Sequence, residues 1–175
     1  MSSVARDLCH VAACASCSEL NRAISERVLA LQHSELAHKS HFFAGRFENI
    51  YLAAEHIPQL QTILDTALDH AASLLHMDRQ ALRLGFWFNI MQTGDATLPH
   101  SHDDDDELLS GTYYLQVPPG SGALVLQLPE GATEVTPKEG QFVLFHPAVE
   151  HEVLPHQADT PRISIGFNVG EAVSR

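Results

Sequence analysis

From Leu82 onward the chain consists of short runs rich in aromatic and β-branched residues, separated by Gly and Pro. The runs read FWFNIM, GTYYLQV, GALVLQL, GQFVLF and RISIGFNV, and the segments PPGSG and PKEG lie between some of them. Runs of this length, divided by turn residues, are typical of antiparallel strands. They predict a mainly β fold whose core is an antiparallel double sheet, a jelly roll or a related barrel.

The first eighty residues follow a helical pattern instead. Ser16-x-x-Glu19 has the spacing of a capping box, and apolar residues follow it at helical intervals. A second apolar stripe runs from Leu60 to Leu75, and Pro58 suits the first turn of that helix. These patterns predict two helices, the second of which lies against the sheet.

A chain of 175 residues fits one domain that is large enough for a hydrophobic core. Neither a linker, a repeat nor a low-complexity segment divides it. We therefore expect a single domain over residues 1–175, with a helical support region at 1–80 and the jelly-roll core at 81–170. The two amphipathic helices could supply the face of a homodimer.

Acidic residues outnumber basic ones by 22 to 10, and the formal net charge is -12. Such a balance disfavours nucleic acid and anionic membranes as partners. The sequence holds no apolar run near the roughly 20 residues that are needed to cross a bilayer. Its N-terminal VAACA stretch is too short and broken for a secretory signal, so we expect a cytoplasmic location.

All three cysteines, Cys9, Cys14 and Cys17, lie within the first 17 residues. An odd, clustered set argues against a disulfide framework. The pair Cys14-x-x-Cys17, with His10 nearby, could hold a metal or act in redox chemistry. The arrangement that we expect is reduced thiols packed along the first helix, because free cysteine is commonly buried.

The motif His100-x-His102 carries the first indication of function. Residues i and i+2 of a strand point to the same side, so an extended segment aims both imidazoles at one point. His151, in FHPAVEHEVLP, also lies in a β-rich, turn-bounded context and is the best candidate for a third ligand. The pattern predicts a metal site, although a histidine pair alone is commonly part of a solvated loop.

The last apolar run supplies a candidate anion site. In RISIGFNV, Arg162, Ser164, Gly166 and Asn168 alternate with apolar residues, so one face of the strand is polar. An arginine on the inner face of a strand needs an anion, and guanidinium binds a carboxylate through two parallel hydrogen bonds. Arg162 and Ser164 are therefore predicted to bind an acid. The simpler alternative is an ion pair at the strand end.

The order and spacing of these pieces resemble a known family. HSHDDDDELLSGTYYLQVPPGSGALVL, followed by PKEGQFVLFHPAVEHEVLP and then PRISIGFNV, looks like the 2-oxoglutarate and Fe(II)-dependent oxygenase superfamily. More narrowly, it is similar to bacterial oxygenases with HxH, SGxYY, FxP, HxV and RISxxFN motifs. The resemblance covers roughly residues 84–170. It implies a double-stranded β-helix core, a cupin-like jelly roll backed by helices.

The resemblance also implies the cofactors and their ligands. It implies Fe(II) bound by His100, His102 and His151. The residues that it implies for 2-oxoglutarate are Arg162, at the distal carboxylate, with Ser164 beside it and Tyr114 and Asn168 in the same pocket. The implied activity is oxidative decarboxylation of 2-oxoglutarate coupled to hydroxylation of a small-molecule or peptide substrate. The fold does not specify that substrate.

One residue departs from the family pattern. The superfamily usually uses two histidines and one carboxylate, as HxD or HxE, and this triad leaves three positions free on the metal. Here the residue two after His100 is His102. Either the site has three histidine ligands, or the register shifts and His102-x-Asp104 is the HxD pair. The narrower resemblance favours His100 and His102, and both registers remain open at this point.

Two other functions would use the same residues. A cupin-like metal enzyme that does not use 2-oxoglutarate would keep the three histidines and leave Arg162 to bind substrate or to stabilise the fold. A non-enzymatic metal- or ligand-binding module would keep the fold and bind metal weakly. Binding of 2-oxoglutarate separates the oxygenase from both.

Overall fold

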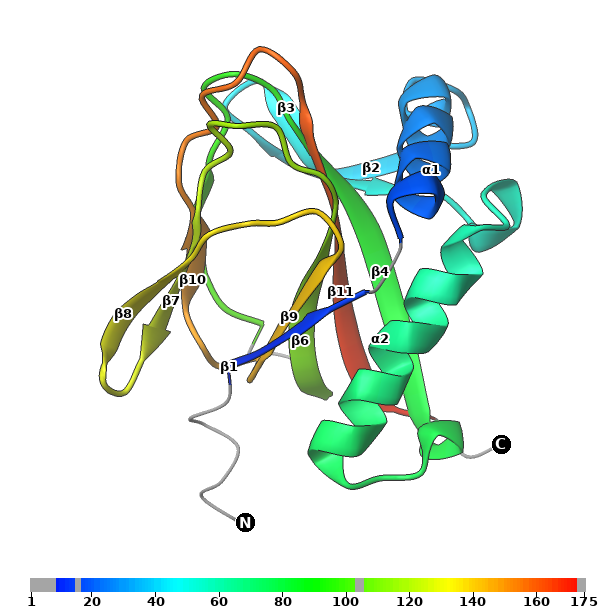
Figure 1. Cartoon of the computed structure of the whole chain (residues 1–175), viewed down its shortest axis with the longest axis vertical. Helices are drawn as coiled ribbons and strands as arrows, with labels where there is room; N and C mark the ends of the chain where they lie inside the picture. Colours follow the sequence, from blue (N-terminus) through cyan, green and yellow to red (C-terminus); the bar gives the residue numbers. More distant parts are fainter. Residues whose placement is uncertain (1–8, 15–16, 103–105, 173–175) are drawn as a thin grey trace.

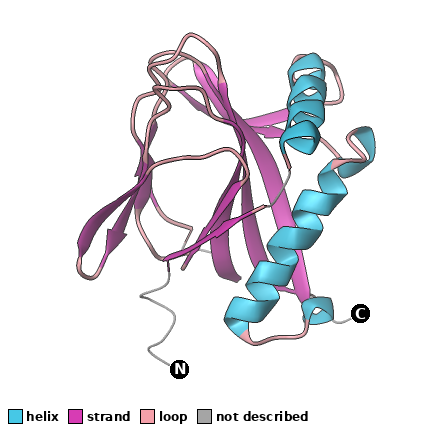
Figure 2. Cartoon of the chain, in the orientation of Figure 1, coloured by secondary structure: helices cyan, strands magenta, loops and turns pink. Residues whose placement is uncertain are grey.

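Two antiparallel sheets face one another, and both long helices lie on the outer face of the larger sheet (Figures 1 and 2). The computed structural model describes residues 9–14, 17–102 and 106–172. Within them the larger sheet has seven strands in the order β1-β9-β6-β11-β4-β3-β2, and the smaller has four in the order β5-β10-β7-β8. The strands are β1 (Cys9–Ala13), β2 (His38–Phe43), β3 (Arg46–Tyr51), β4 (Leu82–Met91), β5 (Thr97–His100), β6 (Glu107–Gln116), β7 (Leu124–Leu128), β8 (Gly131–Val135), β9 (Gln141–Phe145), β10 (His151–Val153) and β11 (Arg162–Glu171).

The predicted jelly roll is confirmed. The five aromatic and β-branched runs form β4, β6, β7, β9 and β11. The apolar runs did not include β5, β8 and β10, which are short, or the three strands of the N-terminal region. Four residues of β8 are exposed, so this strand lacks the apolar alternation that marks a half-buried strand.

The N-terminal region adds strands as well as helices. β1 pairs with β9 at one edge of the larger sheet, and the hairpin β2–β3 extends the opposite edge beyond β4. Residues 1–80 were expected to form a helical support region, and that expectation lacked these three strands. The segment His38–Phe43 reads HKSHFF and is largely exposed, so no apolar period indicated a strand there.

The helices are α1 (Ser18–Leu31) and α2 (Leu60–Leu75), and short 3-10 segments cover Ala54–His56 and Arg79–Ala81. Both predicted stripes are buried, and α2 lies against the larger sheet, as expected (Figure 1). Ser16 of the predicted capping box lies outside the described residues; the N-cap of α1 is Cys17, without a side-chain cap. Pro58 precedes α2, whose N-cap is Gln59, and so is not in its first turn. None of the helices among the described residues is long and apolar enough to span a bilayer.

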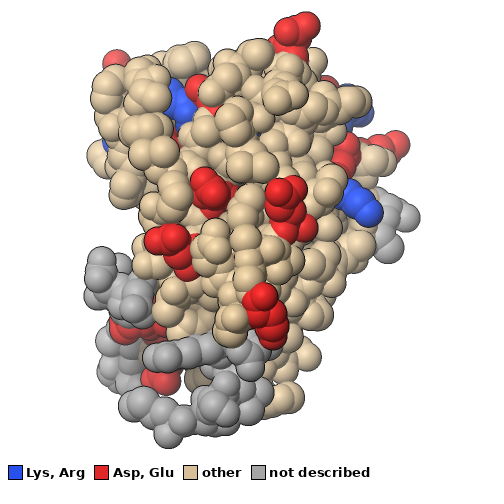
Figure 3. Space-filling view, turned by 90° about the vertical axis from the view of Figure 1, so that its left-hand side faces the viewer, with Lys and Arg blue, Asp and Glu red and all other residues tan. Residues whose placement is uncertain are grey.

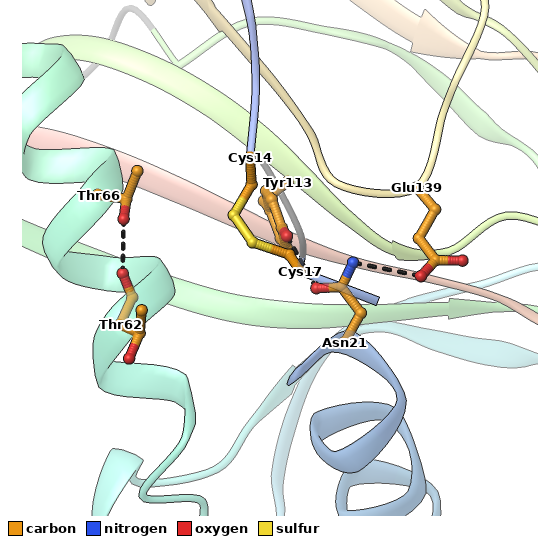
Figure 4. The surroundings of a disulfide bond; sticks show 7 residues. All are labelled: Cys14, Cys17, Asn21, Thr62, Thr66, Tyr113 and Glu139. Atoms are coloured by element: carbon orange, nitrogen blue, oxygen red, sulfur yellow. Dashed lines mark hydrogen bonds between the residues drawn. A yellow bond between two sulfur atoms is a disulfide. The ribbon is translucent and has the colours of Figure 1, made fainter. Parts of the chain in front are cut away.

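The cysteines differ from the expectation of reduced thiols along the first helix. Cys9 lies in β1, where its backbone pairs with Phe145, so it is in an extended strand. Cys14 and Cys17 form a disulfide just before α1, with their Cα atoms 5.9 Å apart (Figure 4). That separation is within the range that a disulfide can bridge. The expectation failed because β1, which no sequence pattern indicated, ends beside the start of α1 and places Cys14 next to Cys17.

Close beside the disulfide, Tyr113 of β6 donates a hydrogen bond of 2.8 Å to the Asn21 side-chain oxygen on α1 (Figure 4). Burial raises the pKa of Tyr113 to about 12, so the phenol keeps its proton at neutral pH. The Asn21 amide also donates to Glu139 at 3.4 Å. This chain of contacts fastens the start of α1 to the larger sheet.

Strand β11 lies in the middle of the larger sheet, paired with β4 and β6. Its residues Ile163, Ile165, Phe167 and Val169 are fully buried in the core between this sheet and the helices. Arg162, Ser164, Gly166 and Asn168 face the space between the two sheets, where a cavity lies. The predicted alternation along β11 is therefore confirmed, and it separates the structural core from the candidate site.

Close packing of β11 requires a glycine on β6. Phe167 pairs with Gly111, and a Cβ at position 111 would lie 2.5 Å from the Phe167 ring and 2.8 Å from the Val143 carbonyl oxygen. Neither neighbour can move away easily, because the ring is buried and the carbonyl belongs to β9. Gly111 thus allows the ring to lie flat across the neighbouring strand.

We expect Gly111→Ala to lower the free energy of unfolding by about 1–3 kcal/mol, the usual cost of overpacking a core. Gly85→Ala on β4 is the matched control, because a Cβ there would meet nothing within 4 Å. Its unfolding free energy should stay within about 0.5 kcal/mol of the wild-type value. Urea unfolding followed by far-ultraviolet circular dichroism measures both. Equal midpoints for the two variants would contradict the packing argument.

Candidate active site

Three histidines from two strands and a loop converge between the sheets. His100 ends β5 and His151 begins β10, and the two are direct partners in the antiparallel pair. His102 lies two residues beyond β5, where its backbone N–H donates to the Pro147 carbonyl at 2.9 Å. One nitrogen from each ring lies within 4.8 Å of the others. The sequence-distant His151 therefore joins the HxH pair, as the metal-site prediction requires.

Backbone carbonyls orient two of these rings. Nδ1 of His100 lies 2.9 Å from the Leu98 carbonyl oxygen, and Nδ1 of His151 lies 3.0 Å from the Val149 carbonyl oxygen. A carbonyl only accepts, so Nδ1 carries the proton in both rings and Nε2 keeps its lone pair. Such a bond is the usual way in which a protein fixes the tautomer of a metal-binding histidine.

His151 is held in its neutral form. The pKa of its imidazole is lowered to about 3, chiefly by burial and in smaller part by the nearby His100 and His102 rings, against a raising contribution from the Val149 carbonyl. Its ring packs against Phe145 at a centroid distance of 4.7 Å. A neutral imidazole is the form that binds metal ions, so this nitrogen donor is ready at physiological pH.

A cavity of about 660 Å³ extends from the three histidines along the inner face of the larger sheet. All seven predicted site residues line it: His100, His102, His151, Tyr114, Arg162, Ser164 and Asn168. Asp104, the alternative ligand in the shifted register, lies outside the described residues. The volume is in the range of pockets that bind small ligands and cofactors.

Arg162 carries a buried positive charge on the cavity wall. Its side chain is 3% exposed and donates to the Gly122 carbonyl at 3.1 Å, while Nε has no hydrogen-bond partner. Among the described residues no carboxylate forms an ion pair with it. Burial lowers the pKa of the guanidinium, yet arginine stays charged in proteins. A buried cation without a counter-ion is a candidate binding site for an anion.

Tyr114 and Gly122 complete this end of the cavity. The guanidinium carbon of Arg162 lies 5.0 Å from the Tyr114 ring centroid, and the fully buried Tyr114 hydroxyl has no hydrogen-bond partner. A Cβ on Gly122 would collide with the Leu154 carbonyl oxygen, so only glycine brings its own carbonyl close enough to hold Arg162. A carboxylate bound here would satisfy both the Arg162 Nε–H and the Tyr114 hydroxyl.

Several lining residues were not identified from the sequence. Trp87 lies over Gly166, where a Cβ would meet the indole at 2.5 Å, and its ring is 5.9 Å from His102. Asn89 and Thr97 also line the cavity, and each has a buried side-chain oxygen that lacks a hydrogen-bond partner. The FWFNIM run indicated a strand, but which of its side chains face the cavity depends on pairing with β11. The β2–β3 hairpin contributes a further set of lining residues that the sequence did not indicate, namely His41, Phe42, Phe43, Glu48, Asn49 and Tyr51.

Part of the acidic run that follows the HxH motif is described. Asp106 and Glu107 lie 2.8 Å and 3.5 Å from the Arg83 guanidinium on β4. Both carboxylates are thus engaged in an ion-pair cluster with Arg83 at the surface. Asp103, Asp104 and Asp105 lie outside the described residues.

A sequence profile of the 2OG-Fe(II) oxygenase superfamily matches residues 73–170. No curated protein matches the chain by sequence. The fold is similar to that of a Pseudomonas putida prolyl-4-hydroxylase, with 21% identity and a TM-score of 0.68 over 94% of this chain and 93% of that chain. A Trichoplax adhaerens prolyl hydroxylase, solved with a hypoxia inducible factor peptide fragment, has 15% identity and a TM-score of 0.68 over 94% and 84% of the two chains.

A third similar structure is the epimerase SnoN in complex with Fe3+, α-ketoglutarate and nogalamycin RO. It shares 15% identity and a TM-score of 0.73 over 95% of this chain and 80% of that chain. At these identities the structural likenesses establish the fold.

The buried His151 makes the stability of the metal-free protein depend on pH. Between its folded pKa of about 3 and the ordinary histidine value of 6.5, the unfolded chain binds a proton that the folded chain does not. The free energy of unfolding should therefore fall as pH is lowered from about 6.5, by up to roughly 1.4 kcal/mol per unit from this residue.

Urea unfolding in the presence of a chelator, repeated at several pH values, measures the effect. His151→Gln should lose this part of the pH dependence, whereas His33→Gln, which removes an exposed histidine, should keep it. The same slope in wild type and His151→Gln would mean that His151 is protonated in the folded protein.

Proposed function

Because its superfamily profile matches residues 73–170, the chain belongs to the 2OG-Fe(II) oxygenases, and we propose that His100, His102 and His151 bind the iron. The protein is an Fe(II)- and 2-oxoglutarate-dependent dioxygenase, which couples decarboxylation of 2-oxoglutarate to oxidation of a substrate, normally its hydroxylation. The assignment of the ligands rests on one observation. Three imidazole nitrogens lie within 4.8 Å of one another at one end of the cavity.

The donor set fits a divalent iron. Imidazole nitrogen is a suitable ligand for iron, and three protein donors leave other positions for a chelating cofactor and oxygen. Two of the rings have Nε2 free for the metal because their Nδ1 protons are bound by carbonyls. Unlike the common two-histidine, one-carboxylate triad, this set carries no negative charge of its own.

We assign the other end of the cavity to the distal carboxylate of 2-oxoglutarate. Support comes from the buried Arg162 guanidinium and Tyr114 hydroxyl, both with polar atoms that lack partners in the protein. Ser164 lies beside Arg162 on the same face of β11 and is 3% exposed. Asn168 accepts a hydrogen bond of 2.9 Å from Ser110, so its amide N–H groups remain available to the cavity.

Iron and 2-oxoglutarate, when bound together, supply the oxidising chemistry by reaction with oxygen. The protein contributes position and shielding. Arg162 and Tyr114 hold the cofactor acid at one end, so that it has a single orientation relative to the three histidines. The two facing sheets exclude water from the walls of the cavity, and this strengthens each polar contact made inside it.

We propose a small molecule or a peptide as the substrate. Structures with similar folds carry such ligands, a hypoxia inducible factor peptide in one and nogalamycin RO in another. Nucleic acid fits poorly with a net charge of -12. Figure 3 agrees, since the face that it displays carries scattered acidic side chains and few basic ones.

Replacing Arg162 tests the cofactor site. Arg162→Gln should weaken 2-oxoglutarate binding by about 100-fold or more, because a buried carboxylate that loses its charged partner costs on the order of 3 kcal/mol. Iron binding should be unchanged. Anaerobic titration of the Fe(II) protein with 2-oxoglutarate, followed by the visible charge-transfer band, measures the affinity.

Arg83→Gln is the matched control, because Arg83 lies outside the cavity and pairs with Asp106 and Glu107. It should bind 2-oxoglutarate as the wild type does. An Arg162→Gln protein with wild-type affinity would remove Arg162 from the cofactor site.

The register of the metal ligands is tested by His100→Ala against Asp104→Ala, since His102 belongs to both possible sets. We expect His100→Ala and His151→Ala to lose stoichiometric iron and Asp104→Ala to retain it, because each ligand supplies one of only three protein donors. The ratio of iron to protein after anaerobic loading and dialysis gives the answer. Loss of iron in Asp104→Ala with retention in His100→Ala would establish the shifted HxD pair instead.

A further inference from the structure

The mouth of the cavity is lined by exposed aromatic side chains. Phe42 is 66% exposed, and Phe43, beside it on β2, also reaches the surface. Leu98 on β5, 54% exposed, lies across the opening, and all three line the cavity. Large apolar side chains gathered at one exposed site mark a place where a ligand or partner binds.

The backbone beside these rings is strained. His41 has a φ of +57°, which is uncommon for a residue other than glycine. It lies in the middle of β2. Its neighbours Ser40 and Phe42 pair with residues of β3, whereas His41 does not. Since the side chain is exposed, core packing does not explain the strain. Strained residues of this kind cluster at ligand-binding sites, where the surrounding contacts hold them.

A hydrogen-bond network fixes the His41 ring. The Asn49 amide nitrogen lies 3.1 Å from Nδ1 of His41, and the Ser40 hydroxyl lies 2.7 Å from the same atom. The Tyr51 hydroxyl accepts from Asn49 at 3.3 Å, and the Ser40 and Tyr51 hydroxyl oxygens lie 3.4 Å apart. An amide N–H only donates, so Nδ1 of His41 is an acceptor and its proton is on Nε2. His41 lines the cavity, so we take its Nε2–H as the hydrogen-bond donor that this residue offers there.

The carboxylate that lines this wall is already paired with a cation. Glu48 is the carboxylate on the hairpin side of the cavity, and it lies 3.3 Å from Arg46. Arg46 also contacts Asp95 at 3.4 Å. The remaining buried cation of the lining, Arg162, is assigned to 2-oxoglutarate. A ligand that rests on Phe42 and Phe43 thus meets apolar surface and one neutral donor, which favours an uncharged molecule.

We propose that the β2–β3 hairpin and Leu98 bind the substrate, and that the substrate is an uncharged small molecule with an aromatic or polycyclic part and an acceptor oxygen. The flat part packs on Phe42, Phe43 and Leu98, and a carbonyl or hydroxyl oxygen accepts from Nε2–H of His41. The inference rests on the proposed function, because it names the substrate class of the same cavity. A volume of about 660 Å³ accommodates the cofactor and a molecule of this kind.

Trp87 gives a direct readout. It is the single tryptophan of the chain and lines the cavity, so its fluorescence reports ligands that enter. The probes are 1-tetralone, a bicyclic aromatic ketone, and tetralin, which has the same skeleton without the oxygen. Each is titrated into protein loaded with Zn(II) and 2-oxoglutarate, with N-acetyltryptophanamide as the control for non-specific quenching. We expect saturable quenching by 1-tetralone and binding of tetralin that is weaker by about tenfold.

The variants separate the two kinds of contact. His41→Asn keeps a residue that tolerates the left-handed backbone and should weaken 1-tetralone about tenfold while leaving tetralin unchanged. Phe42→Ser should weaken both probes. Leu36→Ser removes an exposed apolar side chain outside the cavity and should affect neither probe.

Three results would overturn the proposal. They are the absence of saturable quenching by 1-tetralone, equal loss of both probes in His41→Asn, and quenching by a proline-containing peptide but by neither probe, which would indicate a peptide substrate. Binding of 2-oxoglutarate is measured first, and the titration is repeated without metal and cofactor. Loss of 2-oxoglutarate binding would overturn the proposed function alone, while failure of 1-tetralone in cofactor-loaded protein would overturn the substrate class alone.

Discussion

The position of β11 in the middle of the larger sheet is the constraint on which the structure depends. Hydrogen bonds to β4 on one side and β6 on the other fix its register over its whole length. Because side chains alternate along a strand, one set fills the core beneath α1 and α2 while the other faces the cavity. A shift by one residue would place Arg162 in the core and Ile163 in the cavity, so folding and binding require the same register.

Two buried polar groups that destabilise the cofactor-free protein are suited to binding the cofactor. A guanidinium buried without an acid costs free energy, and so does the buried Tyr114 hydroxyl without a partner. Both lie at the same end of the cavity, and a carboxylate relieves both. Below about pH 6.5 the buried His151 is likewise without a proton that a histidine in water would hold. The fold thus keeps polar groups in states that suit ligands better than they suit an empty cavity.

Family membership chooses among functions that the residues alone left open. Three histidines and an arginine fitted an oxygenase, a cupin-like metal enzyme or a binding module equally well in chemical terms. The superfamily match over residues 73–170 identifies the first. Within that family the hairpin β2–β3, with Phe42, Phe43 and the constrained His41, forms the part of the cavity wall where we place substrate recognition.

Local sequence patterns predicted the two helices, five of the strands and five candidate residues of the site, to which the family resemblance added Tyr114 and Asn168. The elements could be predicted because apolar periodicity records which side of an element is buried, and the candidate residues because HxH and RISIGFNV are each short local segments. The tertiary structure alone brought His151 opposite His100, since β5 and β10 are paired although fifty residues apart. It also decided the hairpin at 38–51, the disulfide between Cys14 and Cys17, and the place of Trp87 over Gly166. Those features arise from contacts between distant segments, which the order of residues in any one segment does not contain.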